Sequence, residues 1–206
     1  MQTLSFALPK GRLAEETIDL FLKKGICTPG VVDFSSRKLI FEDKDAKMRF
    51  LVVRNSDVPT YVEKGAADFG IVGKNVLEED GLGLYEFFDF KFEACRMSVA
   101  VPDGRHQQYT HNMRVATSFP NITKKFFAGK GVFVEVIKLY GSIEIAPLTG
   151  LSEYIVDLVQ SGETLRKNGL EEVEVIMQSS ARLVGNQNLV RAKHERVKEI
   201  LSMLEY

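Results

Sequence analysis

Short apolar runs alternate with amphipathic stretches from one end of the chain to the other. Apolar residues at Leu13, Ile18 and 20–22 recur at the spacing of one helical face, and they predict a helix that ends at Gly25. Asp57 followed by Val58-Pro59 is typical of a helix start, because Asp caps the first turn and Pro tolerates its missing N–H there. Further helices are predicted at residues 119–127 and 191–204, and strands at residues 4–8, 38–41, 49–53, 68–72, 97–101, 114–116, 132–137 and 154–159.

This alternation of strands and helices predicts an α/β fold built on largely parallel sheets. The aromatic-rich segment at residues 85–92 predicts a crossing between two domains, and a return of the chain near Ala181 puts the final helix back on the first domain. The predicted domains are residues 1–91 with 181–206, and residues 92–180.

The composition, 45% hydrophobic and 27% charged over 206 residues, is that of an ordinary globular protein. Lys and Arg number 27 against 28 for Asp and Glu, so the net charge of −1 excludes a general positive field for nucleic acid. Anionic ligands must therefore be bound by local clusters. The two cysteines form no CxxC pair, no basic leader precedes the first strand, and no run of 18 apolar residues occurs. We expect a soluble, cytoplasmic protein.

The most specific segment is IVDLVQSGETL at residues 155–165. Asp157 lies on a predicted strand, and a tight turn at residues 161–164 follows the end of that strand. A helical turn is expected to begin at Thr164. Gly162 permits close backbone approach, successive N–H groups hold an anion, and the Ser161 and Thr164 hydroxyls add donors. Because Asp157 can accept hydrogen bonds from two adjacent ribose hydroxyls, the segment predicts a site for a sugar 5-phosphate. A lone SGxT sequence more often only caps a short helix, and the preceding Asp157 favours the phosphate site.

Basic residues follow the ends of two predicted strands in the first half of the chain. Lys10-Gly11-Arg12 lies where the first strand passes into the first helix, and Arg54 follows the strand FLVV. Ligands of open α/β sheets bind outside the carboxyl ends of the strands, so these side chains predict an anion site. A basic surface loop explains residues 10–12 equally well, and pairing with an acid explains Arg54.

Two further polar residues at strand ends leave alternatives open. Arg96 opens the strand MSVAV and can enter a cleft between sheets. Glu144 follows a Gly-Ser turn, where it is either a solvated turn residue or a ligand of a ribose hydroxyl or a magnesium-bound water. No cage of oxygen ligands for a metal and no Ser/His or Cys/His arrangement for covalent catalysis is visible.

Several segments, in order along the chain, together resemble one family. They are LPKGRL, VRNSDVP, DFGIVGKNVLEE, ACRMSVAVP, RVATSFP and the long run YGSIEIAPLTGLSEYIVDLVQSGETLRKNGL. The chain resembles the catalytic chain of ATP phosphoribosyltransferase, the enzyme that opens histidine biosynthesis, over essentially its whole length. The last run is close to the diagnostic signature of that family.

The resemblance implies two α/β domains with a periplasmic-binding-protein-like (type II) topology and an active site in the cleft between them. It implies that the loop from Asp157 to Leu165, including Glu163, binds phosphoribosyl pyrophosphate, with Glu144 beside the ribose. Arg49 and Ser118 are expected substrate ligands by their positions in matching segments. The remaining residues look like binders of ATP and pyrophosphate: Lys10, Gly11, Arg12, Arg54 and Arg96. Within the whole set, Lys10, Arg54 and Asp157 are the expected catalytic residues.

The implied reaction is attack of N1 of the ATP adenine on C1 of the phosphoribosyl group, with departure of pyrophosphate and magnesium. No side chain acts as a nucleophile, and Mg²⁺ is expected as a substrate complex with no site of its own on the protein. Longer family members carry a C-terminal histidine-binding domain, whereas this chain stops at Tyr206. It therefore resembles the short form, a homodimer within a hetero-oligomer that includes a subunit similar to histidyl-tRNA synthetase. The sequence is also compatible with a truncated long form.

Two other functions remain open. One is an anion- or solute-binding protein of the same fold. The other is a salvage phosphoribosyltransferase that acts on a free base. Such enzymes usually carry two adjacent acids before the phosphate loop, whereas here Asp157 follows Val156.

Overall fold

The chain folds into two compact units in the computed structural model, which describes residues 2–105, 108–186, 188 and 192–205. Unit 1 comprises residues 1–93 and 180–206, and unit 2 comprises residues 94–179. The predicted domain limits differ from these units by one or two residues at each crossing. Each unit has its own sheet and its own buried cores.

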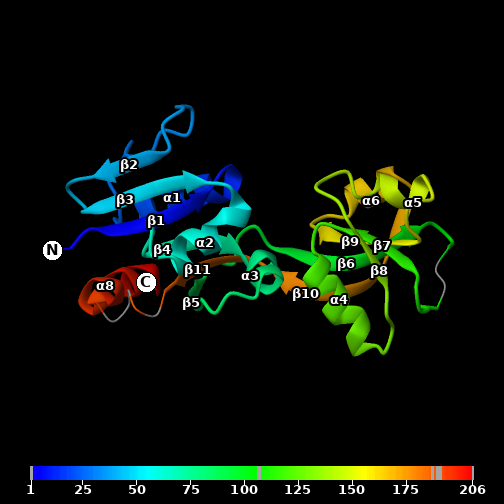
Figure 1. Cartoon of the computed structure of the whole chain (residues 1–206). Coiled ribbons are helices and arrows are strands. Elements are labelled where there is room, and N and C mark those ends of the chain that lie inside the picture. Colours follow the sequence, from blue (N-terminus) through cyan, green and yellow to red (C-terminus); the bar gives the residue numbers. More distant parts are fainter. Residues whose placement is uncertain (1, 106–107, 187, 189–191, 206) are drawn as a thin grey trace. The chain divides into compact units, whose positions relative to one another are not determined.

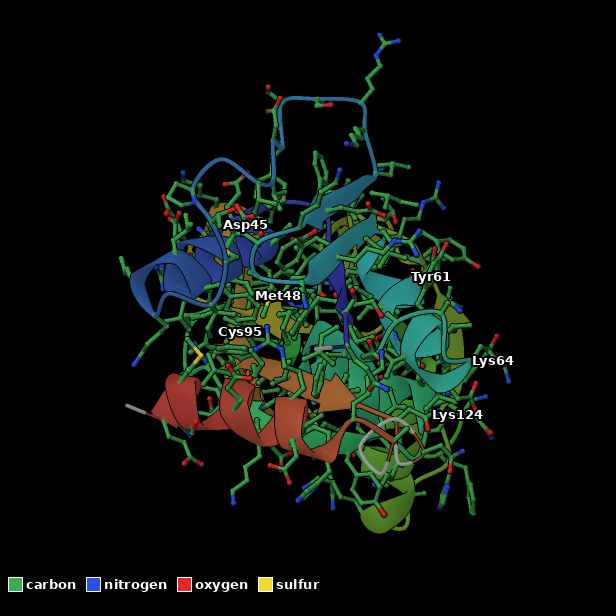
Figure 2. The ribbon with its side chains drawn as sticks, turned by 90° about the vertical axis from the view of Figure 1, so that its left-hand side faces the viewer. Asp45, Met48, Tyr61, Lys64, Cys95 and Lys124 are labelled. Atoms are coloured by element: carbon green, nitrogen blue, oxygen red, sulfur yellow. The ribbon has the colours of Figure 1, made fainter. Side chains whose placement is uncertain are left out.

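The sheet of unit 1 has the strand order β2-β3-β1-β4-β11-β5 (Figure 1). β1 pairs in parallel with β3 and β4, whereas the pairs β2 with β3, β4 with β11 and β11 with β5 are antiparallel. The turn of the β2–β3 hairpin carries Asp45 (Figure 2). The strands are β1 (Leu4–Pro9), β2 (Ile40–Asp43), β3 (Met48–Val53), β4 (Phe69–Gly73), β5 (Tyr85–Asp89) and β11 (Ala181–Gly185).

Helices cover both faces of this sheet. The helices are α1 (Arg12–Lys23), α2 (Val58–Glu63), α3 (Lys74–Asp80) and α8 (His194–Glu205). Successive residues of a strand point to opposite faces, so Phe6 and Leu8 of β1 enter the core that contains Phe21 of α1 and Ile200 of α8. Ala7, between them, enters the core formed with α2 and α3.

The sheet of unit 2 has the strand order β10-β6-β9-β7-β8 (Figure 1). β7 pairs in parallel with β8 and β9, whereas β6 is antiparallel to both β9 and β10. One core packs α4 on the face that carries Met97 and Val156, and the other packs α5 and α6 on the face that carries Ala100 and Ile155. The elements are β6 (Cys95–Pro102), β7 (Arg114–Thr117), α4 (Pro120–Gly129), β8 (Glu135–Lys138), α5 (Ile145–Leu148), β9 (Tyr154–Val159), α6 (Glu163–Lys167) and β10 (Leu170–Ser179).

The predicted strands and helices are present, but the prediction of largely parallel sheets was wrong. Both sheets are mixed, because β2, β5, β6, β10 and β11 enter them through antiparallel pairs. The apolar pattern of a strand is the same whether its neighbour runs parallel or antiparallel to it, so the pattern could not predict the strand directions. β10 was not predicted, because its glutamates at 171, 172 and 174 interrupt the apolar pattern. The residues of β5 were predicted only as a segment that crosses between the domains.

The predicted start of α2 is confirmed in position, because α2 begins at Val58 with Asp57 as its N-cap residue, but the predicted capping contact is absent. Asp57 was expected to cap α2, but it ends a 3₁₀ turn at Asn55–Asp57 and its side chain makes no cap hydrogen bond. Its carboxylate instead accepts from the Ser56 hydroxyl at 3.0 Å, and Pro59 lies in the first turn of α2 as predicted. The predicted start of the last helix at Arg191 lies outside the described residues. No helix in the described part of the chain has the length and apolar character needed to cross a membrane.

Candidate functional site

The carboxyl edge of the unit 2 sheet gathers several of the predicted site residues. β7 and β9 are parallel, with Thr117 opposite Val156, so Ser118 follows β7 at the level of Asp157 on β9. β6 runs the other way, and its second residue, Arg96, therefore lies opposite Val159 at the same edge. Residues from three strands thus meet where ligands of such sheets bind.

The loop after β9 forms a small polar cavity at this edge. The cavity has a volume of about 200 Å³ and is lined by Glu144, Asp157 and residues 158–165. Gly162 has φ +74°, a conformation that other residues rarely adopt. The N–H groups of Ser161 and Gly162 find no acceptor among the described residues, so they are available to an anion. α6 begins at Glu163, one residue before the predicted helical turn.

Asp157 has an unusual electrostatic environment. Its pKa is raised to about 6, mainly by burial; a hydrogen bond from the Leu158 N–H to Oδ1 at 2.8 Å opposes the rise, and the nearby charge of Glu144 adds to it. Its side chain is half-buried and lines the cavity. A bound diol would supply donors that favour the ionised carboxylate, which suits this position for binding ribose hydroxyls.

Arg96 is held by Glu172 and by the loop after β9. Its Nε donates to Glu172 Oε1 at 2.6 Å, its Nη2 pairs with Glu172 Oε2, and its Nη1 donates to the Gln160 carbonyl at 3.1 Å. Arg166 approaches the same turn from α6, where its Nη1 donates to the Ser161 carbonyl at 3.2 Å. Both arginines therefore contact the backbone of the phosphate-loop candidate. A basic residue shortly after the loop was a usable sequence signal for Arg166, but nothing local to residue 172 pointed to Glu172.

The carboxyl edge of the unit 1 sheet brings together Lys10 and Arg54. Pro9 pairs with Val53, and the Lys10 N–H donates to the Val53 carbonyl at 2.9 Å, so the two cations directly follow neighbouring parallel strands. Both side chains are exposed, and neither forms an ion pair within the described residues. Gly11 has φ +98° with open space at its Cα, which leaves the backbone accessible. Lys10 and Gly11 also line a cavity of about 510 Å³, whose other lining residues include 33, 34 and 36–39.

Two other predicted cations of unit 1 have different surroundings. Arg12 contacts Glu93, with Nε 2.5 Å from Oε1, and this hydrogen bond and charge raise the pKa of Arg12. Arg49 is the second residue of β3, near the opposite end of the strand from Arg54, and its Nε lies 4.0 Å from Glu42 Oε1. At about 3.3 Å per residue, some 16 Å of strand separates Arg49 from Arg54, so the structure does not bring these two residues together.

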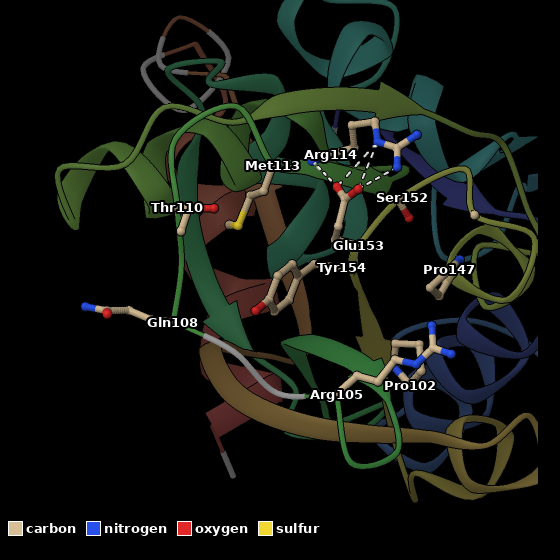
Figure 3. Close-up of a pocket in the computed structure, with 11 residues that line it drawn as sticks. Pro102, Arg105, Gln108, Thr110, Met113, Arg114, Pro147, Ser152, Glu153 and Tyr154 are labelled. Carbon is tan, nitrogen blue, oxygen red and sulfur yellow. Dashed lines mark hydrogen bonds and ion pairs between the residues drawn. The ribbon is translucent and has the colours of Figure 1, made fainter.

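Another cavity lies at the opposite edge of the unit 2 sheet, around the starts of β7 and β9 (Figure 3). It has a volume of about 290 Å³ and contains none of the predicted site residues. Arg114 and Glu153 point toward one another there, and the Arg114 Nη2 lies 2.5 Å from Glu153 Oε1, so the guanidinium charge is already matched. The carboxyl-edge cavity, which has open N–H groups, is the better candidate for an anion.

The family model for ATP phosphoribosyltransferase (HisG) matches residues 54–206 of this chain, which include Arg54, Arg96, Glu144 and the loop after β9. The chain belongs to the ATP phosphoribosyltransferase family. Similar members include ATP phosphoribosyltransferase of Geobacter metallireducens, 53% identical over 98% of this chain and 97% of that protein. The enzyme of Caldanaerobacter subterraneus is 50% identical over 99% and 97% of the two chains.

One solved structure gives the same assignment, and the structural likenesses together confirm the predicted fold class. The ATP phosphoribosyl transferase (HisG:HisZ) complex from Thermotoga maritima contains a chain that matches with a TM-score of 0.86 and 36% identity, over 98% of this chain and 97% of that one. The alkanesulfonate-binding protein SsuA from Xanthomonas axonopodis, bound to MOPS, matches with a TM-score of 0.55 at 11% identity, over 99% and 72% of the chains. The second likeness is one of fold alone, and it agrees with the expected periplasmic-binding-protein-like topology of an ATP phosphoribosyltransferase.

Proposed function

We propose that this chain transfers the phosphoribosyl group of phosphoribosyl pyrophosphate to N1 of the adenine of ATP, forming phosphoribosyl-ATP and pyrophosphate. Membership of the ATP phosphoribosyltransferase family supports the reaction. The observation that carries the proposal to residues is the 200 Å³ cavity, in which open backbone N–H groups and Asp157 lie a few residues apart. A sugar 5-phosphate needs such a pairing of an anion cradle with an acceptor for ribose hydroxyls.

In this proposal unit 2 binds phosphoribosyl pyrophosphate. The turn at Ser161 and Gly162 receives the 5-phosphate through N–H groups, and the hydroxyls of Ser161 and Thr164 add donors. Asp157 and Glu144 accept hydrogen bonds from the ribose hydroxyls. Glu163 and Leu165 complete the wall of the same cavity, which supports their inclusion. Ser118 follows β7 at the level of Asp157, so it is a candidate for a further hydroxyl contact.

Unit 1 is the proposed side for ATP and for the departing pyrophosphate. Lys10 and Arg54 are exposed cations on neighbouring strand ends, Gly11 offers accessible backbone, and Arg12 follows at the start of α1. Substrate binding by Arg49 remains a prediction that its position on β3 does not support.

Catalysis in this proposal rests on alignment and charge. N1 of adenine displaces pyrophosphate at C1 with inversion, so one C–N bond forms as one C–O bond breaks, and the pyrophosphate keeps the electron pair. Arg54 and Lys10 stabilise the negative charge on the leaving group, and Asp157 orients the ribose. Mg²⁺ enters and leaves as part of the pyrophosphate-bearing substrate and product.

We further propose that the chain works as a homodimer within a hetero-oligomer that contains a HisZ-like regulatory subunit. The Thermotoga maritima complex of HisG with HisZ supports this assembly. A cytoplasmic location is part of the same proposal, because ATP and phosphoribosyl pyrophosphate are cytoplasmic metabolites.

The direct test mixes the purified chain with ATP, magnesium and phosphoribosyl pyrophosphate, with and without a HisZ-like subunit. Mass spectrometry detects phosphoribosyl-ATP, and nuclear magnetic resonance assigns the new bond to N1. If phosphoribosyl-ATP forms only when the HisZ-like subunit is present, the whole proposal is supported. If it forms without that subunit, the reaction stands and only the requirement for the subunit is rejected. Transfer to a free nucleobase in place of ATP, or no product from a confirmed complex, would reject the proposed reaction.

A further inference from the structure

Glu172 of β10 is a charged residue next to the candidate site that the proposed reaction does not use. Its carboxylate accepts hydrogen bonds from Nε and Nη2 of Arg96, and Oε1 also accepts from the Ser98 hydroxyl at 2.7 Å. The side chain of Ser98 is fully buried, and its residue lies directly opposite Asp157 in the β6–β9 pair. The arginine holds the pKa of Glu172 below its usual range, so this carboxylate is ionised at neutral pH.

Arg96 also contacts the turn after β9 (residues 160–162). Its Nη1 donates to the carbonyl of Gln160, the residue that follows β9. A Cβ placed on Gly162 would lie 4.0 Å from Nη2 of the same guanidinium, so Arg96 also borders the centre of the turn. The chain of contacts from Glu172 through Arg96 to the turn therefore ties β10 and the turn after β9 to β6, whose Arg96 lies 76 and 64 positions earlier in the sequence than Glu172 and Gln160.

We propose that Glu172 is a positioning residue: it fixes the Arg96 guanidinium, which holds the turn after β9 in the form that receives the phosphate of phosphoribosyl pyrophosphate. The inference rests on the proposed function and assigns a role within the same site. A planar guanidinium held by two parallel hydrogen bonds has one orientation, whereas an arginine without that partner samples many rotamers. Loss of the carboxylate charge frees Arg96 from the Gln160 carbonyl, and the turn loses one of its two guanidinium contacts.

This role predicts a specific pattern of kinetics. Glu172 touches no substrate in the proposed site, so its loss weakens binding of phosphoribosyl pyrophosphate and leaves the chemical step largely intact. For Glu172→Gln we expect the KM for phosphoribosyl pyrophosphate to rise about tenfold, the size of one charged hydrogen bond, with kcat within about threefold of wild type. The KM for ATP should stay within about twofold of wild type.

The control variant is Glu174→Gln on the same strand. Glu174 is also partly buried and ion-paired, with Lys130 Nζ at 2.6 Å from Oε1, and Lys130 directly follows α4. It therefore loses a similar ion pair without contacting the turn. Two further variants, Arg96→Ala and Arg96→Ala/Glu172→Gln, complete a double-mutant cycle for the Arg96–Glu172 contact. If Glu172 acts through Arg96, adding Glu172→Gln to Arg96→Ala changes the KM no further.

The experiment measures steady-state kinetics on the assembled enzyme, together with the thermal shift that phosphoribosyl pyrophosphate produces. The expected result is a raised KM and a reduced ligand-induced shift in Glu172→Gln but not in Glu174→Gln. An unchanged KM in Glu172→Gln, an equal loss in Glu174→Gln, a fall in kcat alone, or full additivity with Arg96→Ala would each overturn the positioning role. Wild-type enzyme that neither binds phosphoribosyl pyrophosphate nor forms product would overturn the proposed function instead, and this inference with it.

Discussion

Asp157→Asn is expected to stabilise the free protein at neutral pH while weakening its affinity for phosphoribosyl pyrophosphate. Asn keeps the shape of Asp and an oxygen for the Leu158 N–H, which donates at 2.8 Å, but it carries no charge. The substitution therefore removes only the cost of an ionised carboxylate that is partly buried next to Glu144. The opposite signs of the two effects separate a residue kept for function from one kept for stability.

The magnitude follows from the pKa of Asp157, which burial raises from 3.8 to about 6. At about 1.4 kcal/mol per pKa unit, the difference of about 2 is worth about 3 kcal/mol of unfolding free energy. Below pH 3.8 the group is protonated in the folded and the unfolded chain, so this stability is fully present. It is lost as the pH rises through 6, where the folded protein must ionise the group. The advantage of Asp157→Asn over wild type therefore grows by about 3 kcal/mol between these pH values.

The assay is urea denaturation of both proteins at a series of pH values from below 4 to 8, without ligand. Asp89→Asn is the control, because its effect on the free energy of unfolding at neutral pH is expected to have the opposite sign. Burial alone would raise the pKa of Asp89, but hydrogen bonds from Lys91 and Ser180 and the nearby Arg182 lower it to about 2. The stability that Asp89 contributes is present above pH 3.8 and lost as the pH falls toward 2, so Asp89→Asn should destabilise the protein at neutral pH.

If the difference in unfolding free energy between Asp157→Asn and wild type does not change with pH, the predicted cost of ionising Asp157 is refuted. A variant that is less stable than wild type by more at pH 7.5 than at pH 4 would refute it too. Either result would mean that the carboxylate is well solvated or paired with a donor in the folded state. An Asp157→Asn variant with unaltered affinity for phosphoribosyl pyrophosphate would separately reject the proposed contact with the ribose hydroxyls.

Three further substitutions test other parts of the molecule. Arg54→Ala should lower kcat of the assembled enzyme by roughly a hundredfold if Arg54 meets the leaving pyrophosphate, and an unchanged turnover number would reject that role. Gly162→Ala must adopt φ +74°, so we expect about 1 kcal/mol less stability by denaturation and a higher KM for phosphoribosyl pyrophosphate; an unchanged KM would argue against the cradle. Gly70→Ala would put a Cβ 2.6 Å from Val58 Cγ1, and should cost about 1–3 kcal/mol of unfolding free energy, whereas Gly83→Ala, which meets open space, serves as the neutral reference.

Much of the local structure was predictable from the sequence because its causes act over a few residues. The helix at Arg12–Lys23 follows from apolar spacing and ends before Gly25, which has φ +67°. The strand Tyr154–Val159 and the turn after it are contiguous in sequence, and so the cavity around Asp157 could be assembled from one segment. The Pro in the first turn of α2 was predictable for the same reason.

The tertiary structure decided which strands are neighbours and in which direction they run. Arg49 and Arg54 bracket one apolar run and were both expected to bind substrate, yet the strand carries them to its opposite ends. Arg96 and Glu172 are 76 positions apart, and only the antiparallel β6–β10 pair brings them into contact. Local propensity fixes the turn after β9, whereas the ion pair of Arg96 with Glu172 depends on the register of the unit 2 sheet, which no short segment of sequence encodes.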